Sequence, residues 1–147
     1  MQSLIRDINL ATEGRKKIDW VSNFMPTLNT LGDRFEAEQT FKGQTIVVSV
    51  HLEAKTAYLA TVLKRGGADV IVTGSNPLST QDDVAAGLVD MGITVYALYD
   101  CTDEEYFNFL HKALDHKPHI IIDDGGDLVN LLHTTRQDAK ERLLGGS

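Results

Sequence analysis

The chain of 147 residues is 42% hydrophobic and 24% charged, the balance of a single soluble globular domain. Its net charge of −7 and its scattered basic residues argue against a nucleic-acid or anionic-membrane partner. It shows no signal peptide and no apolar run near the roughly 20 residues of a membrane span. Its lone Cys101 excludes an internal disulfide and a multi-cysteine metal site. A cytoplasmic protein is therefore expected.

Residues 1–42 predict a helical arm that packs on the core. Between residues 4 and 35, apolar side chains recur at spacings of three and four and form one stripe: Ile18, Val21, Met25, Leu28, Leu31 and Phe35. Pro26 lies inside this stripe and is expected to kink or split the helix, because proline lacks the backbone donor. Lys42-Gly43 ends the arm, and residues 43–147 form the α/β unit.

Strands and helices alternate through residues 43–147. Apolar, β-branched runs predict four strands, at residues 45–50, 69–73, 93–98 and 119–122. Helical spacing, caps and stops predict a helix from residue 54 to Gly66-Gly67 and a second helix that ends at about Met91. Ser79 or Thr80 caps this second helix, with Asp82 in capping-box position. The capping box Thr102 to Glu105 begins a third helix, and two more are predicted at residues 128–133 and 137–144.

This alternation predicts an α/β fold. The expected form is a three-layer, Rossmann- or flavodoxin-like open parallel sheet with helices on both faces, preceded by the helical arm. Periodicity does not predict the order of the strands in the sheet.

Polar clusters follow the first, second and fourth predicted strands, each at or near the start of a helix. They are residues 51–56, residues 74–82 and the acidic turn Asp123-Asp124-Gly125-Gly126-Asp127. Because parallel strands end at one edge of the sheet, where open α/β sheets bind ligands, we expect the clusters to converge there. Helix amino termini also favour acceptor groups.

The histidine and the second cluster each have two interpretations. His51 is either a capping or core residue or an acid/base group, since histidine titrates near working pH. Turn and capping chemistry explains Ser79 and Asp82 but leaves Asn76 and Gln81 without a role.

The acidic turn also has two interpretations. Asp124 is either a solvated turn residue or a catalytic carboxylate. Burial and the like charges of Asp123 and Asp127 would leave it able to accept and return a proton near neutrality.

Other motifs carry no chemistry. His111, His116 and His119 invite a metal interpretation, but a helix end and Pro118 separate them and no carboxylate is suitably spaced, so no metal site is expected. Gly66-Gly67 follows a helix rather than a strand, and no dinucleotide or P-loop motif occurs.

The three clusters together resemble the S-adenosylhomocysteine hydrolase family. The Ser-Thr-Gln-Asp and Asp-Asp-Gly-Gly-Asp motifs are specific, and the resemblance covers essentially the whole chain. The matching pieces are Arg6-Asp7-Ile8, Glu13-Gly14-Arg15-Lys16, Met25-Pro26-Thr27-Leu28, His51 with Thr56-Ala57, Asn76-Pro77-Leu78-Ser79-Thr80-Gln81-Asp82, Thr102-Asp103-Glu104-Glu105-Tyr106, and Asp123 to Asn130 followed by His133-Thr134.

The resemblance implies NAD-dependent hydrolysis of S-adenosylhomocysteine to a nucleoside and homocysteine. In the family, bound NAD oxidises the ribose 3′-hydroxyl, homocysteine is eliminated, water adds at C5′, and the ketone is reduced again. By resemblance, His51 and Asp124 act at the acid/base steps near C4′ and C5′. The implied substrate-binding residues are Glu53, Lys55, Thr56, Asn76, Ser79, Thr80, Gln81 and Asp127.

The resemblance also implies that this chain is an amino-terminal, substrate-binding portion. Family members continue beyond the position of Ser147 into residues that act at the 3′ carbon and a glycine-rich NAD domain. We therefore expect no NAD bound to this chain and no turnover by it alone. A homotetramer is implied for the full-length enzyme, and apolar surface left exposed would favour self-association of the fragment.

The first cluster departs from the family pattern. Many members have Thr and Glu where this chain has Glu53 and Lys55, and that glutamate accepts a hydrogen bond from the adenine amino group. Lys55 is a pure donor and suits the carbonyl oxygen of hypoxanthine, with a bond of about 1.5–3 kcal/mol. S-inosylhomocysteine is therefore an alternative substrate, and S-adenosylhomocysteine stays open because Glu53 remains able to accept from adenine.

A different class of function stays open beside the hydrolase. The chain could be a stand-alone or engineered flavodoxin-like module that binds a partner without turnover. Retained binding of a nucleoside would favour the hydrolase portion over such a module.

Overall fold

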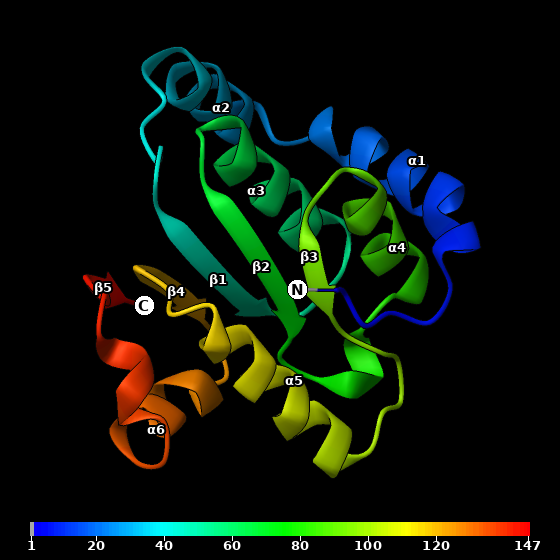
Figure 1. The fold of residues 1–147 in the computed structure, drawn as a ribbon. Coiled ribbons are helices and arrows are strands. Elements are labelled where there is room, and N and C mark those ends of the chain that lie inside the picture. The colour runs from blue at the N-terminus through cyan, green and yellow to red at the C-terminus, as the bar shows by residue number, and fades with distance from the viewer. Residues whose placement is uncertain (1) are drawn as a thin grey trace.

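A single parallel sheet forms the centre of the structure, a computed structural model that describes residues 2–147 (Figure 1). Its five strands stand in the order β3-β2-β1-β4-β5. They are β1 (Thr45–Val50), β2 (Asp69–Gly74), β3 (Thr94–Tyr96), β4 (Ile120–Asp123) and β5 (Gly145–Gly146). Strands β1 and β2 are buried along nearly their whole length, as expected of Val- and Ile-rich strands covered on both faces.

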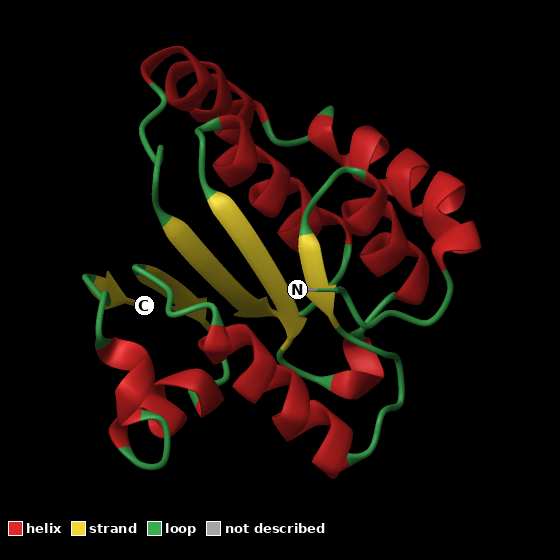
Figure 2. Cartoon of the chain, viewed as in Figure 1, coloured by secondary structure: helices red, strands yellow, loops and turns green. Residues whose placement is uncertain are grey.

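Helices cover both faces of this sheet, which confirms the α/β prediction (Figure 2). Alternate strand residues divide between the faces: Val48 and Val72 join one buried cluster, and Val47 and Ile71 join the other. Helices α3 and α4 pack on the first face with α1 and α2 outside them, and α5 and α6 pack on the second. The helices are α1 (Ala11–Ser22), α2 (Pro26–Glu38), α3 (Ala54–Arg65), α4 (Asp82–Asp90), α5 (Asp103–Asp115) and α6 (Asp127–His133). Within residues 2–147, none is long and apolar enough to cross a bilayer.

The strand order reverses direction between β1 and β4. The chain steps outward from β1 through β2 to β3, then returns to place β4 on the other side of β1. In this register Ser49 of β1 lies between Thr73 of β2 and Asp123 of β4. Open α/β sheets bind ligands outside the carboxyl ends of the strands at such a reversal. The residues that follow β1 and β4 therefore occupy the expected position of a site.

The amino-terminal arm differs from the prediction at its start. Leu4 is extended: its N–H donates to the Val95 carbonyl at 2.8 Å, and the Ala97 N–H donates to the Leu4 carbonyl at 3.0 Å. Helical structure begins only with a 3-10 turn at Ile8–Leu10. The helix start expected at residue 4 was wrong because the segment pairs with the free edge of β3.

The arm contacts α4 most closely at two glycines, Gly14 of α1 and Gly87 of α4. A Cβ atom on Gly14 would lie 1.7 Å from the Asp83 carbonyl oxygen, and one on Gly87 would lie 2.9 Å from the Arg15 nitrogen. The two helices therefore meet backbone to backbone. Pro26 splits the arm as expected, and it is the first residue of α2.

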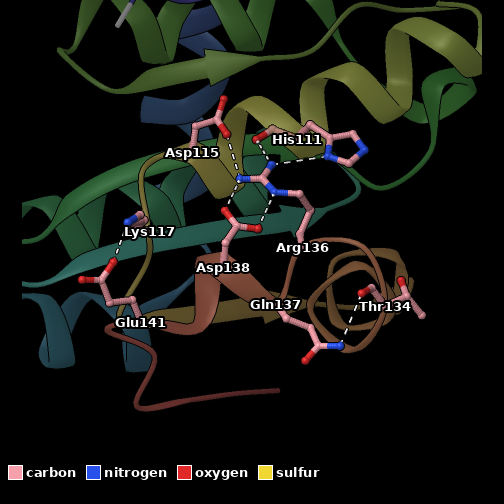
Figure 3. A network of polar contacts seen from close by, with 8 residues as sticks. All are labelled: His111, Asp115, Lys117, Thr134, Arg136, Gln137, Asp138 and Glu141. Atoms are coloured by element: carbon pink, nitrogen blue, oxygen red, sulfur yellow. Dashed lines mark hydrogen bonds and ion pairs between the residues drawn. The ribbon is translucent and has the colours of Figure 1, made fainter.

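The carboxyl-terminal segment is held against α5 by Arg136 (Figure 3). Its guanidinium donates to Asp115 Oδ1 at 2.8 Å, to the His111 carbonyl at 2.9 Å and to Asp138 Oδ1 at 3.1 Å. The helix expected over residues 137–144 was wrong: a 3-10 turn spans Gln137–Lys140, and the chain then extends into β5. The Leu144 N–H instead donates to the His119 carbonyl at 2.7 Å, a contact that draws this end of the chain to the sheet edge and out of the helix.

The contact between Tyr96 and His116 predicts a pH dependence of stability. The Tyr96 hydroxyl lies 2.9 Å from His116 Nε2. Burial lowers the pKa of His116 below the ordinary 6.5, against the opposing charges of Asp69 and Asp115. The unfolded chain therefore binds this proton at higher pH than the folded chain. The stabilisation is complete above pH 6.5 and is lost as the pH falls below it.

Urea unfolding above and below pH 6.5 measures this effect. The free energy of unfolding should fall at the lower pH, and His116→Asn should reduce that fall. An equal fall in both proteins would assign the pH dependence to other groups.

Candidate functional site

Three loops meet at the carboxyl edge of the sheet, and they carry the three polar clusters predicted from the sequence. The Asp124 N–H donates to the Ser49 carbonyl at 3.2 Å, which places the acidic turn beside the end of β1. On the other side of β1, the Ser75 N–H donates to the Val50 carbonyl at 3.2 Å. The structure thus brings the clusters together where the strand order reverses.

The side chain of His51 joins the loop after β1 to the loop after β2. Its Nδ1 lies 2.6 Å from Ser79 Oγ, and that hydroxyl donates to the Asn76 carbonyl at 3.1 Å. The contact orients the ring whichever of the two groups donates, because an imidazole nitrogen and a hydroxyl can each give or accept the shared proton. His51 is exposed, and within residues 2–147 its Nε2 makes no hydrogen bond. The ring is thus held through one nitrogen, and the other is left without a protein partner among the described residues.

The acidic turn uses one carboxylate for its own structure. Asp123 accepts from the Gly126 N–H at 3.0 Å and from the Val129 N–H at 3.1 Å, so it ties the turn to α6. Gly126 has a φ of +82°, which glycine adopts without strain. Asp124 is exposed, and the burial expected for it was wrong. Its carboxylate makes no hydrogen bond within residues 2–147 and stands at the same edge as His51.

Asp127, predicted to bind substrate, has a protein partner. Its Oδ2 accepts from the Tyr106 hydroxyl at 2.7 Å, and the Ser75 carbonyl lies 3.3 Å from the same hydroxyl. Burial raises the pKa of Tyr106, and the hydrogen bond to Asp127 and the charges of the acidic turn raise it further. The hydroxyl therefore stays a donor. Sequence reasoning missed this contact, although the capping box Thr102 to Glu105, confirmed here, puts residue 106 in the first turn of α5.

The loop after β2 forms a 3-10 turn rather than a helix cap. Asn76 Oδ1 accepts from the Leu78 N–H at 2.9 Å and caps the turn Pro77–Ser79, which gives Asn76 a structural role. Helix α4 begins at Asp82 with Gln81 as its N-cap, so the cap predicted at Ser79 or Thr80 was wrong. Ser79 bonds to His51 instead, because the turn directs its hydroxyl toward the neighbouring loop.

The remaining residues of this loop bind the arm, the loop after β3 or the loop itself. Asp82 does not complete a capping box; it accepts from the Tyr99 N–H at 2.9 Å and from Arg6 Nε at 3.3 Å. Gln81 Oε1 accepts from Lys17 Nζ at 3.4 Å. Thr80 is buried, and its hydroxyl donates to the Asn76 carbonyl at 3.1 Å. These contacts fix the shape of the loop around His51.

Glu53 and Lys55, at the start of α3, have different surroundings. Glu53 is the N-cap of α3, and its Oε1 accepts from the Thr56 N–H at 3.0 Å. Lys55 is exposed and forms no ion pair within residues 2–147. Lys55 and the buried Thr56 border a mainly apolar cleft of about 610 Å³, whose other lining residues are Phe24, Met25, Pro26, Thr27, Leu28, Leu31 and Leu59. Sequence reasoning assigned part of this stripe to the core and missed the cleft.

The sequence of this chain matches one protein family over residues 2–145, and that family is described as S-adenosyl-L-homocysteine hydrolase. The chain belongs to the S-adenosyl-L-homocysteine hydrolase family. The match confirms the resemblance seen in the motifs, and it includes every loop of the site.

Three relatives show how much of a family member this chain represents. The S-inosyl-L-homocysteine hydrolase of Methanocaldococcus jannaschii is 54% identical over 142 residues, which are 97% of this chain and 34% of that protein. The adenosylhomocysteinase of Pyrococcus abyssi is 52% identical over 97% of this chain and 34% of its own. The adenosylhomocysteinase of Thermotoga maritima is 52% identical over 91% of this chain and 33% of its own length. The chain spans about a third of the length of the curated relatives it matches.

In this member of the hydrolase family, the loops at the sheet edge do not fit a dinucleotide. Dinucleotide-binding sheets place the pyrophosphate at the helix start of the first βα turn. Here the Glu53 carboxylate occupies that helix start, on the Thr56 N–H. Asp123 and Asp127 put further negative charge at the start of α6. Like charges would repel a pyrophosphate at both places, so the described residues do not fit NAD.

The three histidines that invited a metal interpretation have separate partners. His111 Nδ1 lies 3.3 Å from Arg136 Nη1, and His119 Nδ1 accepts from the Thr45 N–H at 2.9 Å. His116 contacts a tyrosine hydroxyl, as described above. Within residues 2–147, no three His, Cys, Asp or Glu side chains gather as metal ligands would.

Proposed function

We propose that the chain is the substrate-binding portion of a hydrolase that cleaves S-adenosylhomocysteine or S-inosylhomocysteine to a nucleoside and homocysteine. The observation that carries the proposal is the position of His51 and Asp124, which follow the adjoining strands β1 and β4 at one sheet edge. Relatives named S-inosyl-L-homocysteine hydrolase and adenosylhomocysteinase support it. We place NAD with the part of the longer relatives that this chain does not span.

His51 and Asp124 are proposed as the proton-transfer groups. The contact with Ser79 occupies His51 Nδ1, and Nε2 of this exposed residue has no protein partner within residues 2–147. Asp124 is also exposed, and its backbone rather than its side chain binds Ser49. Groups held by the protein on one side and open on the other suit general acid/base catalysis.

The cleft beside Lys55 is the proposed place of the purine base. Apolar side chains of α2 and α3 suit the faces of an aromatic ring, and Lys55 can donate from the rim. Glu53 caps α3 through Oε1 and is not among the residues that line the cleft, whereas Lys55 is, so Lys55 is the side chain proposed to meet the base edge. A 6-oxopurine offers Lys55 an acceptor, whereas the amino group of adenine offers only donors. The proposal therefore favours S-inosylhomocysteine.

Calorimetric titration of the chain with inosine, adenosine and uridine tests the proposal. We expect inosine to bind more tightly than adenosine, and uridine to bind least, because its smaller base leaves the cleft partly unfilled. If no purine nucleoside binds, the proposal fails in favour of a module without this ligand.

The chain by itself is expected to bind nucleoside without turnover. Its loops do not fit NAD, and no described side chain replaces the oxidation that makes the 4′ hydrogen acidic. Homocysteine release from either thioether, measured with added NAD and a thiol reagent, should equal that of a protein-free blank. NAD-dependent release by the purified chain would contradict this expectation.

A further inference from the structure

Tyr106 lies between two of the three loops of the site, although no predicted site residue belongs to its helix, α5. Its hydroxyl donates to Asp127 Oδ2 at 2.7 Å, and the Ser75 carbonyl is 3.3 Å away. Asp127 ends the acidic turn, and Ser75 begins the loop after β2. One hydroxyl thus links the acidic turn to the loop that carries Ser79, the partner of His51.

The acidic turn has few other tethers to the rest of the protein. Its backbone donates from Asp124 to the Ser49 carbonyl at 3.2 Å and from Asp123 to the Ser147 carbonyl at 2.7 Å. The Asp123 carboxylate bonds only to amides of the turn and α6. Among residues 2–147, Tyr106 is the one residue outside the turn whose side chain hydrogen-bonds to it. Since the turn carries three carboxylates, their repulsion opposes a closed arrangement.

The interior beneath the turn supplies no alternative anchor. The hydroxyls of Ser49, Thr73 and Ser75 are buried and make no hydrogen bond within residues 2–147. Ser49 and Thr73 are each 1% exposed, and Ser49 is paired with Asp123 across the strands. None of these hydroxyls therefore binds a carboxylate of the turn. The link through Tyr106 is not duplicated.

The helix start holds Tyr106 in place. Thr102 Oγ1 accepts from the Glu105 N–H at 3.2 Å, and Glu105 Oε2 accepts from the Thr102 N–H at 2.8 Å. This capping box fixes the first turn of α5, from which Tyr106 projects. The raised pKa of Tyr106 keeps its hydroxyl protonated across the neutral range, so that it remains a donor to Asp127.

We propose that Tyr106 is a positioning residue: its hydroxyl holds the acidic turn against the loop after β2 and so sets the place of Asp124 relative to His51. The proposal rests on the proposed function for the roles of Asp124 and His51. The tether itself is independent of those roles.

Tyr106→Phe tests the tether, with Tyr96→Phe as a matched control. Both variants keep the aromatic ring and lose one hydroxyl. The Tyr106 hydroxyl contacts Asp127, and the Tyr96 hydroxyl contacts His116, which lies at the carboxyl end of α5. In amide exchange followed by NMR, the Gly125, Gly126 and Val129 amides of Tyr106→Phe should exchange about tenfold faster, the effect of losing one bond to a charged group. In Tyr96→Phe, the same three turn amides should exchange at the wild-type rate, with the amides of β1 in each protein as the internal reference. If the Tyr106 hydroxyl only contributed to overall stability, the turn amides and the β1 amides would be accelerated together.

A conservative variant tests the same contact from its other side. Asp127→Asn keeps an oxygen acceptor for the Tyr106 hydroxyl, so its turn amides should exchange more slowly than those of Tyr106→Phe. Exchange as fast as in Tyr106→Phe would count against the bond to Asp127 as the tether.

Nucleoside binding separates this proposal from the proposed function. If inosine binds the wild-type chain, Tyr106→Phe should weaken it about tenfold and Tyr96→Phe should not. If no nucleoside binds but the turn amides of Tyr106→Phe exchange faster, the proposed function fails and the tether stands. Wild-type exchange at the turn in Tyr106→Phe, or equal acceleration in Tyr96→Phe, would overturn the tether whatever the nucleosides do.

Discussion

Gly14→Ala should destabilise the folded chain by about 3 kcal/mol, at the upper end of the usual cost of overpacking. The new Cβ would lie 1.7 Å from the Asp83 carbonyl oxygen and 2.4 Å from its carbon. Both atoms belong to the α4 backbone, so α1 must move away as a unit. The gain of about 1 kcal/mol in helix propensity does not offset that displacement. Urea unfolding should show a lower midpoint with an unchanged slope.

Gly32→Ala is the matched control, since Gly32 is also a buried helical glycine. Its added Cβ would meet Arg65 Nη1 at 2.8 Å, and that atom is the end of a flexible side chain. We expect a change in stability within about 1 kcal/mol. If both variants lost the same stability, backbone contact between α1 and α4 would not be the cause.

Lys55→Glu should reverse the preference between inosine and adenosine. The lysine is a donor suited to the hypoxanthine carbonyl, and a glutamate would accept from the adenine amino group instead. A bond to a charged group is worth about 1.5–3 kcal/mol, so the ratio of the two dissociation constants should change by about tenfold or more. Calorimetry on the variant gives both constants. Helix α3 should be unaffected, because its N-cap contact comes from Glu53.

Lys42→Glu makes the same charge change at the opposite, amino edge of the sheet, just before β1. It should weaken both nucleosides little and equally, if at all. A Lys55→Glu variant that still binds inosine more tightly than adenosine would exclude Lys55 as the residue that selects the base.

Much of the fold was predictable because local signals agree with the tertiary environment. The continuous Val and Ile run of β1 is typical of a strand buried on both faces, and its predicted bounds are those observed. Pro26 and the capping box at Thr102 act through backbone chemistry that neighbours cannot override. Strand β5 escaped prediction because two glycines carry no strand signal. Leu4 joins the edge of β3 by a pairing that local sequence does not encode.

The location of the site was more predictable than the contacts of its residues. His51 and Asp124 were found because they follow buried strands, and parallel strands end at one edge. Ser79 was predicted as a cap or a substrate ligand, and it binds His51 from a loop distant in sequence. Asp127 likewise binds Tyr106, from another helix. Such pairings depend on the order of the strands in the sheet, which the spacing of apolar residues does not predict. The substrate-binding roles of these residues stay predictions.

The place of nucleoside binding is tested most directly by NMR titration of the ¹⁵N-labelled chain with inosine. We predict saturable amide shifts concentrated in residues 51–56, 75–82 and 123–127, the three loops at the carboxyl edge of the sheet. Shifts should also appear in the α2 and α3 residues that line the cleft beside Lys55. Saturable shifts centred on the amino edge, around His116 and His119, or no shifts at all, would contradict the assignment of the site.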